Sequence, residues 1–191
     1  LNKKASFDII INSNKLGSSY RIYKIVTKKE LNKISRAFIE IYGGDSDKNE
    51  FKEIEDSLFD AGNEVIINMG YDQSNVKVFE GIIESCSVNL HTGFQTNPEK
   101  SILKIECVDK AIKLSNSFTN EIFEQMTDSQ IIKKIVSNVS GLDSKIIDLQ
   151  QEHDYFSKYN SNDWDFVLER ASSNGMVVIN SNNSLSLVNP Y

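Results

Sequence analysis

The sequence predicts an α+β fold that is mainly β, from three observations. Short runs of β-branched and aromatic residues, separated by Asn, Gly, Lys and Ser, recur through the N-terminal half. The hydrophobic period changes from two to about 3.6 near Thr119. The C-terminal segment then combines helical spacing with a hairpin signal. We therefore expect a tube-like antiparallel β-barrel domain in residues 1–115, followed by a small α+β domain in residues 116–191.

Three strands are predicted at 5–11, 19–27 and 36–42. In the second, Tyr20 and Ile22 alternate with Tyr23 and Ile25, so both faces carry apolar groups. Such a sheet is covered in part on both sides, as in the wall of a barrel or tube.

The Gly43-Gly44 pair begins a polar loop, and an irregular segment follows at 51–62. No strand-GxxxxGK-helix pattern surrounds the two glycines, so we interpret them as a turn and not as a phosphate loop.

A hairpin is predicted from strands at 64–71 and 76–84, joined by the turn residues 72–75. The second strand continues to residue 90, and another follows at 101–109 after a loop that contains His91. Cys86 alternates with Ile82 and Val88, and Cys107 lies on the second of these strands. Both cysteines are predicted to be reduced, small buried hydrophobes.

A helix is predicted to begin at Thr127, because Gln130 three residues later completes a capping-box pattern. Its apolar face runs from Ile131 to Val139, and Gly141 ends it. Residues 145–149 are strand-like, and 151–156 are extended.

The segment around Trp164, the only tryptophan, predicts strand, helix and strand. Asn162 can cap the helix, and Asp163 and Asp165 place negative charge where the helix dipole favours it. Two sets of side chains follow from the helical spacing: an apolar face of Trp164, Val167, Leu168 and Ala171, and a solvent face of Asp165, Glu169, Arg170 and Ser172. Gly175 suits the left-handed position after a helix, and Asn182-Asn183 predicts the turn of a final hairpin.

Charge and motif content exclude several function classes. The net charge of −6 argues against nucleic acid as a partner. The N-terminal residues show no signal-peptide pattern, and no apolar run reaches the ~20 residues that span a bilayer. His91 and His153 have no further His or Cys at ligand spacing, so we expect no metal site and no cofactor.

No catalytic constellation is visible either. Asp163 and Asp165 are two apart on one helix and do not face each other, and no GxSxG motif is present. We therefore expect a protein that is not an enzyme and has no small-molecule substrate.

Three stretches of the sequence resemble the Vgr (valine-glycine repeat) spike proteins of contractile injection machines, which are related to phage late control protein D. The first, YNSNDWDFVLERASSNGM, matches at Tyr159, Asn160, Asp163, Trp164, Asp165, Phe166, Arg170, Ala171, Asn174, Gly175 and Met176. The second matches at Gly62, Asn63, Glu64, Val65, Ile67, Gly70, Tyr71, Val78, Phe79, Gly81, Ile82 and Ile83. The third matches at Asp109, Lys110, Ala111 and Lys113.

This resemblance implies an N-terminal hub fragment of the membrane-puncturing spike, in a type VI secretion or phage-tail-like apparatus. It implies a homotrimer for the full-length protein, docking of the hexameric inner tube, and contacts with a downstream spike, tip or effector proteins and baseplate proteins. It also implies assembly in the cytoplasm and export by the machine. The 191-residue chain alone is expected to be a monomer or weak oligomer. A carbohydrate- or peptide-binding β module is the alternative, and a hydrolase domain stays open.

Overall fold

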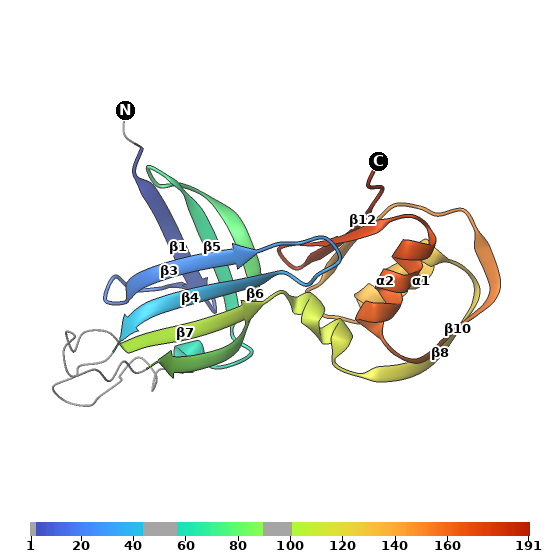
Figure 1. Ribbon diagram of the computed structural model, residues 1–191, viewed down its shortest axis with the longest axis horizontal. Coiled ribbons are helices and arrows are strands. Elements are labelled where there is room, and N and C mark those ends of the chain that lie inside the picture. The colour runs from blue at the N-terminus through green and yellow to red at the C-terminus, as the bar shows by residue number, and fades with distance from the viewer. Residues whose placement is uncertain (1–2, 44–56, 90–100) are drawn as a thin grey trace. The chain divides into compact units, whose positions relative to one another are not determined.

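The computed structural model describes residues 3–43, 57–89 and 101–191, and its chain forms two compact units (Figure 1). Unit 1 contains residues 1–28 and 36–108. Unit 2 contains residues 29–35 and 109–191. The chain is mainly β, as the sequence predicts. None of its helices, in the part that the structure describes, is long and apolar enough to cross a membrane.

Unit 1 is built on one seven-stranded antiparallel sheet in the order β2-β1-β5-β6-β7-β4-β3. Its elements are β1 (Ala5–Ile11), β2 (Asn14–Lys15), β3 (Arg21–Lys28), β4 (Arg36–Gly43), the 3-10 turn η1 (Ser57–Phe59), β5 (Glu64–Tyr71), β6 (Ser74–Asn89) and β7 (Ser101–Val108). The predicted strands at 5–11, 19–27, 36–42, 64–71 and 101–109 are all present within two residues at each end. The predicted Gly43-Gly44 turn and the His91 loop lie outside the described residues, apart from the backbone of Gly43.

The sheet is not closed into a barrel among the described residues, and this corrects the barrel prediction. The hydrogen-bonded order ends at β2 on one side and at β3 on the other. β2 is only two residues long, whereas β3 has eight, so β2 is too short to form a seam along β3. Closure of a barrel depends on strand number and stagger, which alternation within a single strand does not reveal.

The core of unit 1 lies on one face of this sheet. Alternate side chains of neighbouring strands are fully buried there, among them Ile39, Ile67, Phe79, Ile83 and Ile105. On β3 the alternation is interrupted by a bulge between Ile22 and Lys24, and Tyr23 remains exposed. The second apolar face of β3 is therefore only partly covered.

The β5–β6 hairpin is confirmed, with a tighter turn than predicted. The loop is the two-residue pair Asp72-Gln73, and both residues have positive φ, at 52° and 67°. Such a turn matches the right-handed twist of the two strands and lets pairing resume at Ser74.

The two cysteines differ in burial, so the prediction is right for Cys107 and wrong for Cys86. Both are free; Cys107 is buried and Cys86 is exposed. A bulge between Ile83 and Ser85 shifts the register, and β5 pairs with β6 only as far as Ile82, so Cys86 lies past the covered part of the strand. Burial raises the pKa of the Cys107 thiol to about 12, and partial burial raises the pKa of Cys86 as well.

Unit 2 combines two small sheets with two helices. A ribbon pairs β8 (Phe118–Thr127) with β10 (Glu152–Asn162), and a second sheet has the order β11 (Val177–Asn180), β12 (Ser184–Val188), β9 (Asp143–Ile146). The two helices are α1 (Asp128–Ser137) and α2 (Asp163–Ser173), and η2 (Lys110–Ser115) is a 3-10 turn. Figure 1 shows the β8–β10 ribbon curving around α1 and α2. Their shared core includes Phe123, Ile132, Ile135, Trp164 and Val167.

The helical period begins later than predicted, because the residues from Phe118 to Thr127 form strand β8. This segment pairs with β10 along most of its length, and only Phe123 within it is buried. The capping box at the start of α1 is confirmed. The Thr127 N–H donates to Gln130 Oε1 at 2.8 Å, and the Gln130 N–H donates to Thr127 Oγ1 at 3.3 Å. The cap therefore marks where strand changes to helix.

Both predicted ends of α2 are confirmed. Asn162 Oδ1 accepts the Asp165 N–H at 2.7 Å. Gly175 has φ +67°, and the N–H groups of Gly175 and Met176 donate to the carbonyls of Ser172 and Ala171. This is the Schellman pattern, in which a left-handed residue allows the last carbonyls of a helix to be satisfied.

Truncation of Trp164 should destabilise the protein strongly. The indole is 7% exposed within the core of unit 2. Trp164→Ala should lower the free energy of unfolding by about 3–5 kcal/mol, as for other buried aromatic residues. Urea unfolding measures the change, and Tyr159→Ala, at a residue 82% exposed, is the matched control with little effect expected. Equal stabilities of the two variants would show that the indole does not pack as described.

The thiols should differ in reactivity in the native protein. Cys86 should react with a thiol reagent well before Cys107, because Cys107 is buried and its raised pKa leaves little thiolate. The single variants Cys86→Ser and Cys107→Ser assign each phase, and urea should remove the difference. Equal native rates contradict the described burial.

Candidate functional site

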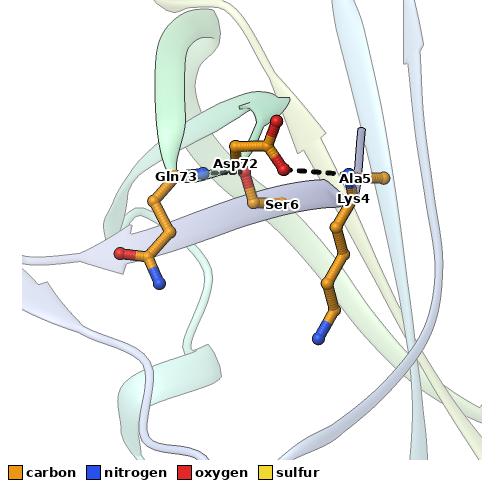
Figure 2. Close-up of a pocket in the computed structure, with 5 residues that line it drawn as sticks. All are labelled: Lys4, Ala5, Ser6, Asp72 and Gln73. Carbon is orange, nitrogen blue, oxygen red and sulfur yellow. Dashed lines mark hydrogen bonds between the residues drawn. The ribbon is translucent and has the colours of Figure 1, made fainter. Parts of the chain in front are cut away.

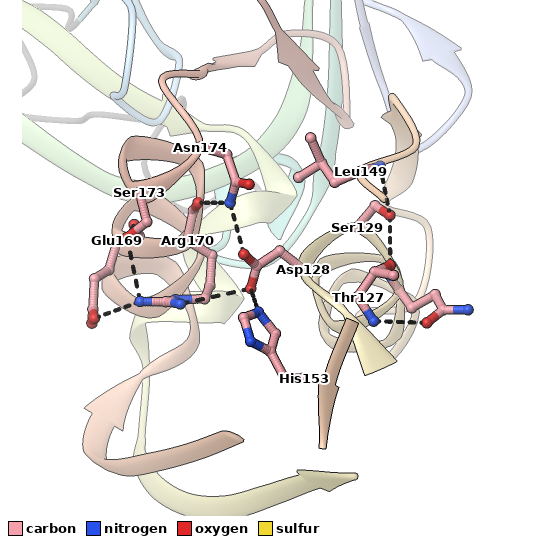
Figure 3. Close-up of polar contacts among 10 residues, drawn as sticks. Thr127, Asp128, Ser129, Leu149, His153, Glu169, Arg170, Ser173 and Asn174 are labelled. Carbon is pink, nitrogen blue, oxygen red and sulfur yellow. Dashed lines mark hydrogen bonds and ion pairs between the residues drawn. The ribbon is translucent and has the colours of Figure 1, made fainter. Parts of the chain in front are cut away.

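A buried polar cluster in unit 2 joins both helices to the β8–β10 ribbon (Figure 3). Asp128, the first residue of α1, lies at its centre. Its Oδ1 is 3.3 Å from His153 Nε2 on β10 and 3.7 Å from Arg170 Nη1 on α2. Its Oδ2 accepts a hydrogen bond of 2.7 Å from Nδ2 of Asn174, the residue that caps α2. One carboxylate at the start of α1 therefore contacts both β10 and α2.

Arg170 is buried in this cluster, which corrects its predicted place on the solvent face of the helix. The residue is only 7% exposed. Its guanidinium carbon lies 4.0 Å from the ring centre of Phe156 and 5.8 Å from that of Phe166. Nη2 donates to Glu169 Oε1 at 2.9 Å. The aromatic rings and Asp128 come from distant parts of the sequence, so helical spacing alone could not place this side chain.

Local capping sets the position of the Asp128 carboxylate. The side chain lies in the first turn of α1, where the helix dipole favours a negative charge. Thr127 and Ser129 hydroxyls are 2.9 Å apart, and Ser129 Oγ accepts the Leu149 N–H at 3.2 Å. Figure 3 shows these contacts beside the cluster. The chain that leads to β10 is thus held to the start of the same helix.

The cluster has a carboxylate–histidine pair but lacks the other parts of a nucleophilic site. The hydroxyl of Ser173 lies against Arg170 Nη2, at 3.4 Å, and is hydrogen-bonded to the Glu169 carbonyl. Within residues 3–43, 57–89 and 101–191, no group of three or more His, Cys, Asp or Glu side chains could hold a metal ion. The contacts formed here hold elements of unit 2 together.

Asp109, from the third stretch that resembles the Vgr family, is the centre of a second buried set of contacts. It has no exposed surface. Its Oδ1 accepts the Ala111 N–H at 3.0 Å, its Oδ2 accepts the Asn183 N–H at 2.7 Å, and its own N–H donates to the Ser35 carbonyl at 3.0 Å. Lys110 adds a backbone hydrogen bond of 3.1 Å to Asn183 Oδ1. Asp109 therefore joins the 29–35 segment, η2 and the β11–β12 turn.

The 29–35 segment lies along β11 through paired backbone and side-chain bonds. Asn32 and Val178 exchange two hydrogen bonds of 2.8 Å. Ser35 makes two more with Asn180, at 2.8 Å and 2.6 Å. No local sequence pattern predicts a role for these polar side chains, because their partners are 145 and 146 residues away in the sequence.

Most residues of the first resembling stretch shape β10 and α2. Asn160 has φ 45° at a bulge in β10, and its N–H donates to Asn120 Oδ1 at 2.7 Å. Asp163 forms an ion pair with the buried Lys158, and Asp165 completes the cap with Asn162. Tyr159, by contrast, is exposed.

The second resembling stretch supplies close contacts in unit 1. A Cβ on Gly70 would lie 2.1 Å from the Ser74 carbonyl oxygen, and one on Gly81 would lie 2.2 Å from that of Val108. Both positions therefore require glycine. Phe79 is fully buried in the core, whereas Tyr71 is 58% exposed.

A shallow depression of about 350 Å³ lies beside the β5–β6 turn (Figure 2). Lys4, Ala5, Ser6, Asp72 and Gln73 line it. Its polar groups are engaged with one another: the Lys4 N–H donates to Asp72 Oδ1 at 3.0 Å, and the Gln73 N–H donates to Ser6 Oγ at 3.0 Å. The depression therefore offers no convergent set of acid, base or nucleophile.

Removal of one partner from the Asp128 cluster should be costly. Arg170→Met leaves a buried carboxylate without its guanidinium, and loss of one member of a buried ion pair typically costs about 3–5 kcal/mol. The matched control is Glu169→Gln, because the Glu169 side chain is 63% exposed and its loss should matter little. Urea unfolding compares them. If Arg170→Met is as stable as the control, the cluster does not hold unit 2 together.

The fold is shared with phage tail and type VI secretion proteins. A 43 kDa tail protein of prophage MuSo2 from Shewanella oneidensis superposes with a TM-score of 0.73 at 11% identity, over 97% of this chain and 53% of that one. The E. coli c3393 protein, a component of the type VI secretion system, gives 0.66 at 13% identity, over 94% and 48%. The Francisella PdpA-VgrG complex, lidded, gives 0.58 at 13% identity, over 100% and 29%.

These neighbours show that the fold is one found in phage tail proteins and in proteins of the type VI secretion system, and the chain spans about half the length of the first of them. No curated protein sequence matches the chain. One family matches nearly all of it, over residues 2–191. The chain therefore belongs to the family described as the Alg8 N-terminal domain.

Proposed function

We propose that this chain is a structural part of a contractile injection apparatus, of type VI secretion or phage-tail-like kind. The observation that carries the proposal is the likeness of fold, which covers 97% of the chain at a TM-score of 0.73 with a phage tail protein. A type VI secretion component is similar over 94% of the chain. Low identity limits this likeness to the fold, so the role is inferred from it.

The chemistry of the buried groups supports a scaffold role without catalysis. Asp109 and Asp128 use their carboxylate oxygens to join segments that are far apart in the sequence. The glycines of the second resembling stretch allow close backbone approaches. A rigid framework of this kind suits a part whose task is to hold others in place.

Within that role, the chain is the N-terminal hub region that docks the spike to the inner tube. The full-length protein is a homotrimer that meets the hexameric inner tube, contacts baseplate proteins and carries a spike with tip or effector proteins. It assembles in the cytoplasm and leaves the cell with the machine. Nucleic acid, a cofactor and a small-molecule substrate have no part in this function.

Deletion of the gene in its source cell tests the proposed function. Particles prepared from the deletion strain and viewed by electron microscopy should lack complete tubes, because the hub starts tube assembly in this proposal. A copy of the full-length gene should restore them, and a copy with Trp164→Ala should restore fewer, since this variant is destabilised. Particles that assemble unchanged without the protein, or a source cell without any such apparatus, contradict the proposal.

A further inference from the structure

The outer face of the β8–β10 ribbon exposes several large apolar side chains. Ile122 is 65% exposed, Tyr155 74% and Tyr159 82%. In the register of the ribbon, Ile122 lies opposite Ser157, and Tyr155 lies opposite Glu124. Side chains two apart on a strand share a face, so Tyr155 and Ile122 are diagonal neighbours on the outside. Exposed apolar groups that gather in this way mark a contact surface.

The exposed charged side chains of this ribbon are all acidic. Glu124, Glu152 and Asp154 are all exposed. The one Lys or Arg in the two strands is Lys158, which is buried and paired with Asp163. We call this surface the acidic ribbon, defined by Ile122, Glu124, Glu152, Asp154, Tyr155 and Tyr159.

Strand β3 of unit 1 has the opposite character. Arg21, Lys24 and Lys28 are exposed, and the strand contains no acidic residue. Tyr23 is 52% exposed, and its ring lies 4.9 Å from that of Tyr42. β3 is also the last strand in the hydrogen-bonded order of its sheet, and among the described residues no strand pairs with its outer edge. We call this surface the basic edge strand, defined by Arg21, Tyr23, Lys24 and Lys28.

We propose that the acidic ribbon of one copy of this chain binds the basic edge strand of a second copy. Charges of opposite sign surround exposed aromatic groups on both surfaces, and each copy carries both. Because the two surfaces differ, the contact is head-to-tail, and it closes into a ring or extends as a chain according to the rotation between copies. The inference goes beyond the proposed function, since it holds whether or not the chain serves an injection apparatus.

The net charge of the protein makes the contact weak and sensitive to salt. Copies with a net charge of −6 repel each other on average, so only an orientation that brings the two surfaces together is attractive. Salt screens interactions between exposed charges beyond roughly 10 Å at about 0.1 M. The attraction should therefore be largest at low ionic strength and at high protein concentration.

Sedimentation equilibrium of the 191-residue chain provides the first test. At a protein concentration of about 500 µM and an ionic strength of about 20 mM, the average mass should exceed 21.6 kDa, and about 300 mM salt should return it toward that value. A wild-type protein that stays at 21.6 kDa under the low-salt condition overturns the proposal.

Charge reversal then identifies the surfaces. The first variant, Glu124→Lys with Asp154→Lys, makes the ribbon basic and changes the net charge from −6 to −2. The second, Lys24→Glu with Lys28→Glu, makes the edge strand acidic and changes it from −6 to −10. Each variant alone should associate at least about tenfold more weakly than wild type, because its two surfaces now repel.

An equimolar mixture of the two variants is decisive. It should associate about as well as wild type, because the first variant keeps the basic edge strand and the second keeps the acidic ribbon. Both variants are negative overall, so general attraction cannot produce this result. Lys113→Glu with Lys145→Glu, at exposed residues outside both surfaces, is the control for the second variant and should associate nearly as wild type does. Far-UV circular dichroism confirms that each variant is folded.

Two results overturn the proposal. Single-surface variants that associate as tightly as wild type would remove these charges from the contact. A mixture that remains monomeric while both variants are folded would assign the two surfaces to partners other than a second copy.

Discussion

The structure of unit 2 depends on the fully buried carboxylate of Asp109. A carboxylate without exposed surface is costly unless its oxygens accept hydrogen bonds. Here both oxygens do so, from Ala111 and Asn183, while the backbone N–H of the same residue holds Ser35. More than seventy residues of sequence separate Ser35 from Asp109, and more than seventy separate Asp109 from Asn183. Loss of this one side chain would leave buried N–H groups on two of them unpaired.

Asp128 is the centre of a second buried cluster in unit 2, in which Oδ2 accepts a hydrogen bond from Asn174 and Oδ1 has only the ion-pair contacts. It contacts His153, Arg170 and Asn174, and the guanidinium of Arg170 in turn lies over the ring of Phe156. Buried polar networks of this kind favour one arrangement of the elements over others, because alternatives leave charges unpaired. In the proposed scaffold role these buried polar groups fix the positions of the elements, while Tyr155 and Tyr159 of the ribbon and Tyr23 of β3 remain exposed.

The local parts of this structure could be predicted from the sequence. The Thr127–Gln130 capping box, the Asn162 cap, the Gly175 terminus and the Asn182-Asn183 turn each depend on residues within a few positions of one another, and all are present. The candidate site was reached only in part. Arg170 and Asn174 were among the matching positions, but their shared partner Asp128 comes from another element.

The sequence by itself determined where most strands begin and end, where both helices begin and where α2 ends, because backbone capping and side-chain alternation are local properties. The predicted end of α1 at Gly141 is wrong, since the helix ends at Ser137. Tertiary structure alone decided that the seven-stranded sheet stays open within the described parts of the chain, that Phe118–Thr127 is a strand, that Arg170 is buried and that Cys86 is exposed. Each of these outcomes depends on another element of the fold. The sheet stays open because β2 is short, and Phe118–Thr127 is a strand because it pairs with β10. Arg170 is buried beside the carboxylate of Asp128, and Cys86 is exposed because β5 stops pairing with β6 before it. Periodicity reports which face a side chain takes on its own element, and it carries no information about what covers that face.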